Sequence, residues 1–252
     1  MHRFHLPPEQ CQSEVLTLTG GQAHHAADVL RVRKSEEAAV LDGAGREFLC
    51  SVQAVERGRI LLKVEQIRVS PVPACRITLA QAIPKGKMFE SILQKATELG
   101  VWRVVPLLSE RVATRLEGET RARKAEKWRQ TAVEAIKQCG QRWLPRVEAP
   151  ATPEAWLAAG EKFDLTLIGS LHGEARHPRE YFLAFEREHV RRPASVCVWI
   201  GPEGDFSAGE VEGARRGGAL PITMGPLILR SETAALYALS VVNYELQAPG
   251  SV

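Results

Sequence analysis

The sequence lacks the features that mark membrane, secreted and metal-binding proteins. It contains no run of about 18 apolar residues, so no membrane-spanning helix is expected. Its opening, MHRFHLPP, lacks the apolar core of a signal peptide, and its five cysteines are scattered without close pairs. No HExxH motif is present either. These absences predict a cytoplasmic protein without a disulfide framework, a metal site or a membrane contact.

The common nucleotide-binding motifs are missing as well. There is no Walker sequence and no GxGxxG, which argues against a nicotinamide or flavin cofactor. Residues 40–45 (VLDGAG) resemble the first motif of Rossmann-type methyltransferases, but that motif must lead into a helix. Here residues 46–52 (REFLCSV) have the pattern of a strand, so we interpret 40–45 as a hairpin turn.

Positive charge is concentrated in one window of a chain that is otherwise nearly balanced. The net charge is +3 over 252 residues, and residues 1–72 contain nine basic and nine acidic side chains. Residues 101–150 contain eleven Lys and Arg against six Asp and Glu. A phosphate-contacting surface and a solvated helix face both produce such a cluster, and charge alone does not decide between them.

The first 72 residues have the pattern of a small β-domain. Short segments suited to strands cover 15–18, 38–41, 47–52 and 59–64, with turn signals at DG and RG pairs between some of them. One short helix is expected at about 22–31. Several short strands at close spacing predict a small barrel, and residues 70–73 (SPVP) predict a linker.

After the linker the pattern changes to alternating strands and helices. Strands are expected at 77–82, 104–108, 163–168 and 196–200, with the apolar composition of a buried parallel sheet. Helical spacing of apolar residues covers 88–99, Gly100 ends that helix, and 119–138 predicts a long charged helix. The sequence therefore predicts an α/β fold, with a small barrel at 1–72 and a domain with a mostly parallel sheet at 73–252.

Three strand ends in the second domain carry glycine-containing turns. They are 168–173 (IGSLHG), 200–205 (IGPEGD) and 224–231 (MGPLILRS). Ligands bind beyond the carboxyl ends of strands in open α/β sheets, and glycines let the backbone approach a ligand closely. One such loop is more often a plain turn, but three in one domain predict a shared pocket. Helices are expected directly after two of the loops, at the capping box 207–210 (SAGE) and at 231–233 (SET).

Residues 200–207 (IGPEGDFS) and 225–234 (GPLILRSETA) together resemble the ribosomal small-subunit methyltransferase E family. Members of that family methylate N3 of one uridine in 16S ribosomal RNA and belong to the trefoil-knotted SPOUT superfamily. Residues 94–101 (QKATELGV), the opening Arg3-Phe4 and 29–31 (VLR) are also typical of it. The resemblance covers almost the whole chain.

The chain departs from the usual family pattern at three places. A glycine is usual where Asp205 stands, arginine is frequent where Leu227 stands, and 137–142 (KQCGQR) replaces the usual EQSGR.

The resemblance implies a PUA-like barrel, a knotted SPOUT methyltransferase domain at the C-terminal end, and a homodimer. It also implies S-adenosylmethionine bound in a bent form by the knot loops. The residues expected to contact this cofactor are Leu171, Ile200, Gly201, Pro202, Gly204, Met224, Gly225, Leu229, Ser231, Thr233 and Ala234.

Methylation of uracil N3 sets the requirements for the catalytic residues. N3 carries a proton that must leave, and it lies on the pairing edge, so the uridine must be unpaired or flipped out. Charge then spreads onto O2 and O4, where a fixed cation stabilises it. Arg230 is the candidate cation, Glu232 the candidate base or orienting group, and Glu203 the second candidate base. The structural alternatives are an ion pair of Arg230 with Glu232, and a Glu203 side chain that only braces its loop.

Several basic residues are candidates for contacts with phosphates of 16S ribosomal RNA. They are Arg111, Arg115, Arg121, Arg123, Lys124 and Arg142, with Arg31 and Arg33 on the barrel. The final helix is apolar over a wide arc, which favours burial on most sides and leaves part of it for a twofold partner.

Two other functional classes are compatible with the sequence. One is a related knotted enzyme that methylates a ribose 2′-hydroxyl, although the barrel and the wording of 228–234 (ILRSETA) favour the uridine N3 enzyme. The other is a non-catalytic RNA-binding module or ribosome assembly factor, which the predicted cofactor pocket argues against.

Overall fold

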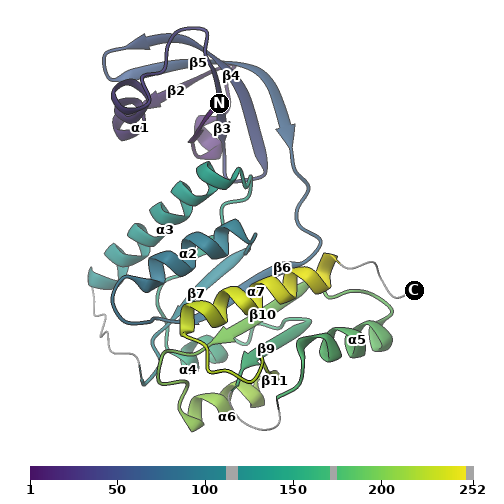
Figure 1. Ribbon diagram of the computed structural model, residues 1–252. Coiled ribbons are helices and arrows are strands. Elements are labelled where there is room, and N and C mark those ends of the chain that lie inside the picture. The colour runs from purple at the N-terminus through teal and green to yellow at the C-terminus, as the bar shows by residue number, and fades with distance from the viewer. Residues whose placement is uncertain (112–118, 171–174, 248–252) are drawn as a thin grey trace. The chain divides into compact units, whose positions relative to one another are not determined.

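The computed structural model describes residues 1–111, 119–170 and 175–247, and the chain divides into two compact units (Figure 1). The first unit contains residues 1–72 together with 133–144, and the second contains 73–132 together with 145–252. The long helix α3 (Glu119–Cys139) therefore contributes residues to both units.

The first unit is built on one curled sheet of five strands. Its elements are β1 (His2–His5), a 3-10 turn (Pro8–Gln10), β2 (Val15–Thr19), α1 (Gly20–His24), a π-helical turn (His25–Val29), β3 (Glu37–Leu41), β4 (Arg46–Glu56) and β5 (Arg59–Val69). The strand order is β1-β3-β4-β5-β2, antiparallel except for the parallel β1–β3 pair. Alternate apolar residues point to the core, as with Leu16 and Leu18 in β2 and Ile60 and Leu62 in β5.

The turn between β3 and β4 confirms the hairpin expected at 40–45. Its two glycines have left-handed backbones, with φ of +71° at Gly43 and +97° at Gly45. A Cβ at Gly43 would lie 2.9 Å from the Leu144 Cβ, and one at Gly45 would lie 2.5 Å from the Trp143 ring. The glycines are required because residues 142–144 bond to this turn, through Leu144 N to the Gly43 carbonyl and Gly45 N to the Arg142 carbonyl.

The second unit is an α/β structure with a six-stranded, wholly parallel sheet. Its elements besides α3 are β6 (Arg76–Ala82), α2 (Met88–Glu98), β7 (Arg103–Leu107), β8 (Arg146–Val147), α4 (Pro153–Ala158), β9 (Leu165–Gly169), α5 (Pro178–His189), β10 (Ser195–Ile200), α6 (Ala208–Arg216), β11 (Ala219–Ile222) and α7 (Ser231–Gln247). The strand order is β11-β9-β10-β6-β7-β8. All loops that follow these strands therefore leave from the same edge of the sheet.

Helices cover both faces of this sheet. One face carries a core that includes Trp199, Phe206 and Ile168, covered by side chains of α4 and α6 such as Trp156 and Ala214. On the other face α7 packs against β10 and α2 (Figure 1). The buried residues of α7 are Ser231, Ala234, Ala235, Ala238, Leu239 and Val242. Hydrogen bonds of Ser231 with Gln81 and with the Gly201 carbonyl place the start of α7 beside the ends of β6 and β10.

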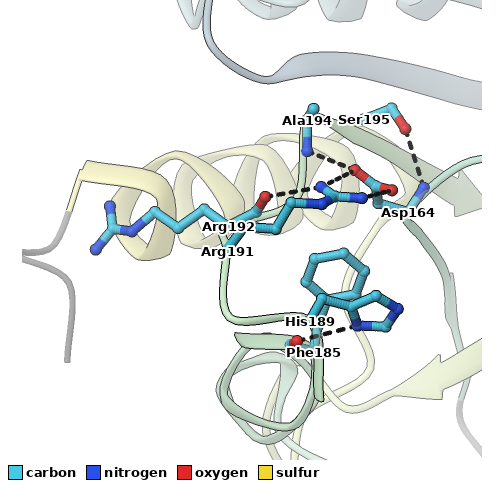
Figure 2. A network of polar contacts seen from close by, with 7 residues as sticks. All are labelled: Asp164, Phe185, His189, Arg191, Arg192, Ala194 and Ser195. Atoms are coloured by element: carbon cyan, nitrogen blue, oxygen red, sulfur yellow. Dashed lines mark hydrogen bonds and ion pairs between the residues drawn. The ribbon is translucent and has the colours of Figure 1, made fainter. Parts of the chain in front are cut away.

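A polar network closes the amino edge of the sheet, opposite the glycine loops (Figure 2). Both carboxylate oxygens of Asp164 accept hydrogen bonds from Arg191, each at 2.8 Å, and Oδ2 also accepts from Ala194 N at 2.6 Å. These hydrogen bonds, chiefly those from Arg191, lower the pKa of Asp164 to about 2. Arg192 donates to the Leu246 carbonyl at 2.7 Å, so the same loop also holds the end of α7.

Candidate functional site

The loops that follow β9, β10 and β11 enclose one cavity of about 420 Å³ at the carboxyl edge of the sheet. This confirms that the glycine-containing turns share a pocket, as far as the described residues extend. The cavity is lined by Gly169, Ser170, Ala175, Ile200, Gly201, Pro202, Glu203, Asp205, Thr223, Met224, Gly225, Pro226, Leu227, Ile228, Leu229, Ser231 and Ala234. Among these lining residues the charged side chains are both acidic, Glu203 and Asp205.

The loop after β10 is a tight turn with Asp205 in a left-handed conformation. Asp205 has φ of +59°, its N–H donates to the Pro202 carbonyl at 3.0 Å, and its Oδ1 accepts from Phe206 N at 2.8 Å. A glycine avoids the steric cost of this backbone, which explains why glycine suits the position and why aspartate is among the tolerated replacements. A Cβ at Gly201 would lie 2.9 Å from Asp205 Oδ1 and 3.2 Å from Phe206 N, so Gly201 is needed for the turn itself.

A buried carboxylate fixes this loop to the end of β7. Glu210, which is 8% exposed, accepts hydrogen bonds from Ser109 Oγ at 3.0 Å, Glu110 N at 2.9 Å and Ser207 N at 2.8 Å. Next to it, Arg111 donates to the Gly204 carbonyl at 2.6 Å. The capping box predicted at 207–210 is confirmed, and its glutamate additionally ties together the loops of two strands.

The loop before α7 forms the opposite wall of the cavity. Gly225 has φ of +100°, and a Cβ there would meet no atom within 4 Å, so its requirement for glycine is conformational. Its N–H donates to Thr223 Oγ1 at 3.2 Å. Leu227 and Ile228 line the cavity although they are 73% and 82% exposed, so this wall is also an apolar surface.

The predicted cofactor residues fall into three groups. Eight of them line the cavity: Ile200, Gly201, Pro202, Met224, Gly225, Leu229, Ser231 and Ala234. Gly204 and Thr233 are exposed residues outside its lining. Leu171 lies outside the described residues.

The three candidate catalytic residues lie close together along the chain but differ in surroundings. Glu203 lines the cavity, and its Oε1 accepts from Lys85 N at 3.1 Å. Arg230 is exposed and Glu232 half-buried, and neither belongs to the lining. Arg230 directly precedes α7, where its carbonyl accepts from Ala234 N at 2.8 Å. Arg230 and Glu232 both belong to the described part of the chain, and no ion pair joins their side chains there.

The candidate RNA-binding residues are mostly exposed. In the first unit Arg31 and Arg33 are exposed, whereas Arg142 bonds to Glu47 Oε2 at 2.6 Å and to Ser70 Oγ at 2.8 Å. In the second unit the exposed candidates are Arg111, Arg121 and Arg123, and Lys124 is half-buried with its ammonium 5.9 Å from the Trp128 ring centroid. Arg115 lies outside the described residues.

Sequence reasoning assigned no role in the site to three residues that shape it: Gln81, Asp205 and Glu210. Gln81 did leave a signal, because it is a polar residue in the otherwise apolar strand segment 77–82. Glu210 was identified only as a helix cap, since nothing in the sequence pairs it with Ser109. Asp205 was noted as a departure from a family pattern, but its place in the cavity lining depends on the left-handed turn.

Four of the five cysteines are shielded, Cys139 is exposed, and the described residues contain no metal cluster. Burial raises the pKa of Cys11 to about 11 and those of Cys50, Cys75 and Cys197 to about 12, so these thiols stay protonated at neutral pH. Within the described ranges no three His, Cys, Asp or Glu side chains gather as a metal would require. Among the helices described, none is long and apolar enough to cross a membrane.

Comparison with known proteins gives consistent matches over both units. The RNA methyltransferase domain family matches residues 71–243, and the RNA methyltransferase PUA domain family matches residues 18–65. Ribosomal RNA small subunit methyltransferase E of Synechocystis sp. is 32% identical over 252 residues, covering 98% of this chain and 78% of that protein. Its counterpart in Bacillus subtilis is 27% identical, covering 94% of this chain and 92% of that protein.

Solved structures match over nearly the same range. Ribosomal RNA small subunit methyltransferase E of Neisseria gonorrhoeae, bound to S-adenosyl methionine, aligns with a TM-score of 0.83 at 27% identity, covering 97% of each chain. A Legionella pneumophila protein with the bound cofactor SAM aligns with a TM-score of 0.85 at 32% identity, covering 96% of each chain. Together with the family matches, these structures confirm the predicted fold class, a PUA-like β-domain followed by an α/β domain with a mostly parallel sheet.

Proposed function

Because the chain belongs to the ribosomal RNA small subunit methyltransferase E family, we propose that it transfers a methyl group from S-adenosylmethionine to N3 of one uridine in 16S ribosomal RNA. The observation that carries this proposal is the glycine-lined cavity at the carboxyl edge of the parallel sheet. The relatives are named as methyltransferases of small-subunit ribosomal RNA, and two related structures contain the bound cofactor. These names specify the RNA but not the methylated atom, and the assignment to uracil N3 is our proposal.

The cavity fits S-adenosylmethionine in size and charge. Its volume of about 420 Å³ lies in the usual range of small-molecule sites. Ile200, Met224 and Leu229 offer apolar walls for the adenine, and Glu203 and Asp205 offer negative charge near a ligand that carries a sulfonium and an ammonium. The cofactor-binding set proposed here is the eight predicted lining residues, with Gly204, Thr233 and Leu171 as predictions beyond the lining.

Bound S-adenosylmethionine supplies a methyl group that is already activated by its sulfonium. The residues of the chain therefore mainly position the reactants and stabilise developing charge. Glu210 and Gly201 hold the loop after β10 in one conformation, and Gly225 allows the sharp turn of the opposite wall. A cavity kept in shape before binding costs little reorganisation when the reaction occurs.

The chemistry at N3 assigns roles to the charged residues around the cavity. As N3 loses its proton, negative charge spreads over the uracil O2 and O4 atoms, and a guanidinium placed there stabilises it. Arg230 fits this role, because it is exposed and lies between the lining residues Leu229 and Ser231. Glu203, which lines the cavity, and Glu232, one residue into α7, are the candidate proton acceptors.

Substrate binding is proposed to use the exposed basic residues of both units. Arg31 and Arg33 in the first unit, and Arg111, Arg121 and Arg123 in the second, present guanidinium groups that suit phosphates of 16S ribosomal RNA. Lys124 adds an ammonium beside Trp128. The proposed setting is the cytoplasm, where small ribosomal subunits are assembled, with no part played by a metal or a membrane.

Two features of the family are proposed for this chain as well: a homodimer and a trefoil knot at the C-terminal end of the second unit. The knot proposal rests on the family to which the chain belongs. Ser231 at the start of α7 bonds to the Gly201 carbonyl, which brings the last helix against a loop 30 residues earlier. Exposed tyrosines on α7 support the dimer proposal.

Nucleoside analysis tests the proposed reaction directly. The purified protein is incubated with S-adenosylmethionine and small ribosomal subunits from a bacterium that lacks its own family member. The RNA is then digested and its nucleosides are measured by mass spectrometry. The expected product is 3-methyluridine, at about one per subunit, with no gain of a 2′-O-methylated nucleoside.

Each alternative gives a different result in that experiment. A ribose methyltransferase yields a 2′-O-methylated nucleoside, and a non-catalytic RNA-binding module yields no new methylated nucleoside although it still binds RNA. Either outcome rejects the proposed uridine N3 reaction. Repeating the reaction with naked 16S ribosomal RNA shows whether the assembled subunit is required.

A further inference from the structure

Gln81 is a buried polar residue next to two lining residues of the cavity, Ile200 and Ser231, and belongs to none of the groups assigned above. It is fully buried, at 0% exposure, as the second-last residue of β6. In the sheet it lies beside Ile200, which ends β10 and lines the cavity. Its strand neighbours Ala80 and Ala82 are apolar, so the polar side chain is an exception in a buried strand.

The Gln81 amide starts a chain of hydrogen bonds that ends at the cavity wall. Its Nε2 donates to Ser231 Oγ at 2.9 Å and to the Ala82 carbonyl at 2.9 Å. Ser231 Oγ in turn donates to the Gly201 carbonyl at 2.6 Å. These hydrogen bonds link β6, the loop after β10 and the first residue of α7, and they join Gln81 to Ser231 across 150 residues of sequence.

The groups at the two ends of this series of hydrogen bonds fix which atoms donate and which accept. The Ala82 carbonyl can only accept, so the Gln81 group that faces it must be the NH₂ and not the oxygen. The same NH₂ then donates to Ser231, which leaves the single hydroxyl proton of Ser231 for the Gly201 carbonyl. A glutamine with its amide reversed would place two acceptors against each other at Ala82.

With the amide in this orientation, one polar atom of Gln81 lacks a hydrogen-bond partner among the described residues. Its Oε1 is buried and accepts no hydrogen bond from any residue that the structure describes. An unpaired buried acceptor destabilises the fold, and such costs are concentrated where function requires them. A residue kept for stability alone is better replaced here by an apolar side chain of similar shape.

The peptide at which this series of hydrogen bonds ends has few other groups that could fix its orientation. The Gly201–Pro202 peptide has no N–H, because Pro202 lacks one, so the Gly201 carbonyl is its one conventional hydrogen-bonding group. Gly201 also has the backbone freedom of a glycine. A hydrogen bond to its carbonyl is therefore the direct way to fix the orientation of this part of the cavity wall.

We propose that Gln81 is a positioning residue of the cofactor site. Through Ser231 it fixes the Gly201–Pro202 peptide and joins the loop after β10 to the start of α7, so the two walls of the cavity keep their spacing before the ligand enters. This inference rests on the proposed function, since it takes the cavity to be the S-adenosylmethionine site. Gln81 acts through Ser231 and has no assigned contact with the reacting atoms.

Replacement of Gln81 by methionine separates positioning from stability. Gln81→Met keeps the shape of the side chain, removes both donors and also removes the unpaired oxygen, so the melting temperature should change by only a few degrees. S-adenosylmethionine affinity, measured by calorimetry well below the melting temperature, should fall roughly tenfold. The matched control is Thr78→Val, which removes a buried hydroxyl from the same strand near its opposite end, where it accepts from Arg103.

A double-mutant cycle tests whether Gln81 acts through Ser231. Ser231→Ala should weaken cofactor binding at least as much as Gln81→Met, and the double variant should be no worse than Ser231→Ala alone. Additive losses would show that the two side chains act independently and would overturn the relay. Thr78→Val should leave the affinity unchanged even if it lowers the melting temperature.

The outcomes separate this inference from the proposed function. If the unaltered protein binds no S-adenosylmethionine, the proposed function fails and the positioning role falls with it. If the unaltered protein binds and Gln81→Met binds equally well, the positioning role alone is rejected. If Gln81→Met does not fold, the comparison of Ser231→Ala with Thr78→Val decides, because equal affinity in these two variants overturns the relay.

Discussion

At the scale of single residues, Arg230 is the strongest candidate for stabilising the uracil anion. It is exposed beside the cavity and forms no ion pair with Glu232, so the purely structural pairing is not seen. Arg230→Ala should lower the single-turnover rate at saturating cofactor by roughly 10²–10³-fold, the usual loss for one preorganised donor. S-adenosylmethionine affinity and melting temperature should stay nearly unchanged.

The conservative variant and the neighbouring acid complete this test. Arg230→Lys should recover only part of the rate, because an ammonium lacks the planar fork of the guanidinium. If Glu232 is the base, Glu232→Gln should be slow and partly rescued at high pH, where N3 ionises without help. A normal rate in Arg230→Ala would remove this residue from the mechanism.

Asp205 provides a second test, because it places a carboxylate in the cavity where the family usually has glycine. Asp205→Asn keeps a side chain that tolerates the left-handed backbone but removes the negative charge. It should weaken S-adenosylmethionine by roughly two- to fivefold, since a partly exposed charge pair contributes about 0.5–1 kcal/mol. S-adenosylhomocysteine, which lacks the sulfonium charge, should lose less.

Calorimetry with both ligands measures this difference. Equal losses for the two ligands would mean that Asp205 acts on the shape of the loop and not on the sulfonium charge. Asp205→Gly serves as the comparison, because it also removes the charge while relaxing the backbone.

Residue roles were predictable where a local pattern encodes them and not where a distant partner does. The glycines at 201 and 225 and the cap at Ser207 could be identified because turns and helix starts have local signatures. Arg142 looked like a phosphate contact, yet its guanidinium bonds to Glu47 and Ser70, more than 70 residues away. Its contact with RNA therefore stays a prediction, with a competing structural role.

At the scale of elements, hydrophobic periodicity located α2 and the buried strands β6 and β10 well, whereas it assigned no bounds to α5. The helix expected at 88–99 is α2 at Met88–Glu98, and Gly100 follows it with φ of +76°. The strands expected at 77–82 and 196–200 match β6 and β10 within one residue. Short elements were missed: β1 and β11 have four residues each, too few to show a period, and their strand character comes from pairing with β3 and β9.

The basic helix α3 carries the electrostatic prediction. Replacing Arg121, Arg123 and Lys124 by Ala should weaken RNA binding and lower the slope of log affinity against log salt by roughly one for each lost phosphate contact. The control removes three exposed arginines elsewhere, Arg179, Arg187 and Arg216. Filter-binding at several salt concentrations measures both slopes, and an unchanged slope in the α3 variant would identify its charges as a solvated face.

The network at the amino edge of the sheet predicts how stability depends on acid (Figure 2). Hydrogen bonds from Arg191 hold the pKa of Asp164 at about 2, below its unfolded value of about 4. A group with a lowered folded pKa stabilises the fold above its unfolded pKa, and this contribution is lost as pH falls through the folded pKa. Asp164→Asn should therefore be less stable than the unaltered protein above about pH 4, and the difference should shrink toward pH 2.

Urea unfolding at each pH from 2 to 7 measures this difference. Asp205→Asn is a matched control, because it makes the same chemical change at a carboxylate outside the network. A stability difference that does not vary with pH would contradict the proposed link between Asp164 ionisation and the network.

At the scale of the whole molecule, the division into two units follows from contacts that the linear pattern hides. The pattern changes near residue 72, where a proline-rich segment separates β5 from β6, and the first unit does contain residues 1–72. Residues 133–144 join it because the β3–β4 turn has glycines that accept Trp143 and Leu144 at close range. In the sequence, only the two glycines of the turn indicate this close packing, and two glycines are equally suited to an ordinary hairpin.

The exposed side of α7 predicts the oligomeric state of the protein. On α7 the buried residues face the chain's own sheet and α2, while Tyr237 and Tyr244 are 43% and 66% exposed and lie seven residues apart, on one side of the helix. Exposed aromatic residues are typical of interface centres, so we expect a twofold dimer through this side of α7. Light scattering at micromolar concentration should give about twice the chain mass of 27.8 kDa.

Charge placed on this side of α7 should separate the subunits, because a desolvated carboxylate without a partner is costly. Tyr237→Glu combined with Tyr244→Glu should therefore shift the measured mass to that of one chain while the circular dichroism of the fold is retained. Val69→Glu, which places the same charge at a 71% exposed apolar residue of β5, should remain dimeric. A monomeric mass for the unaltered protein would contradict the dimer, and a dimer that survives both tyrosine changes would place the interface elsewhere.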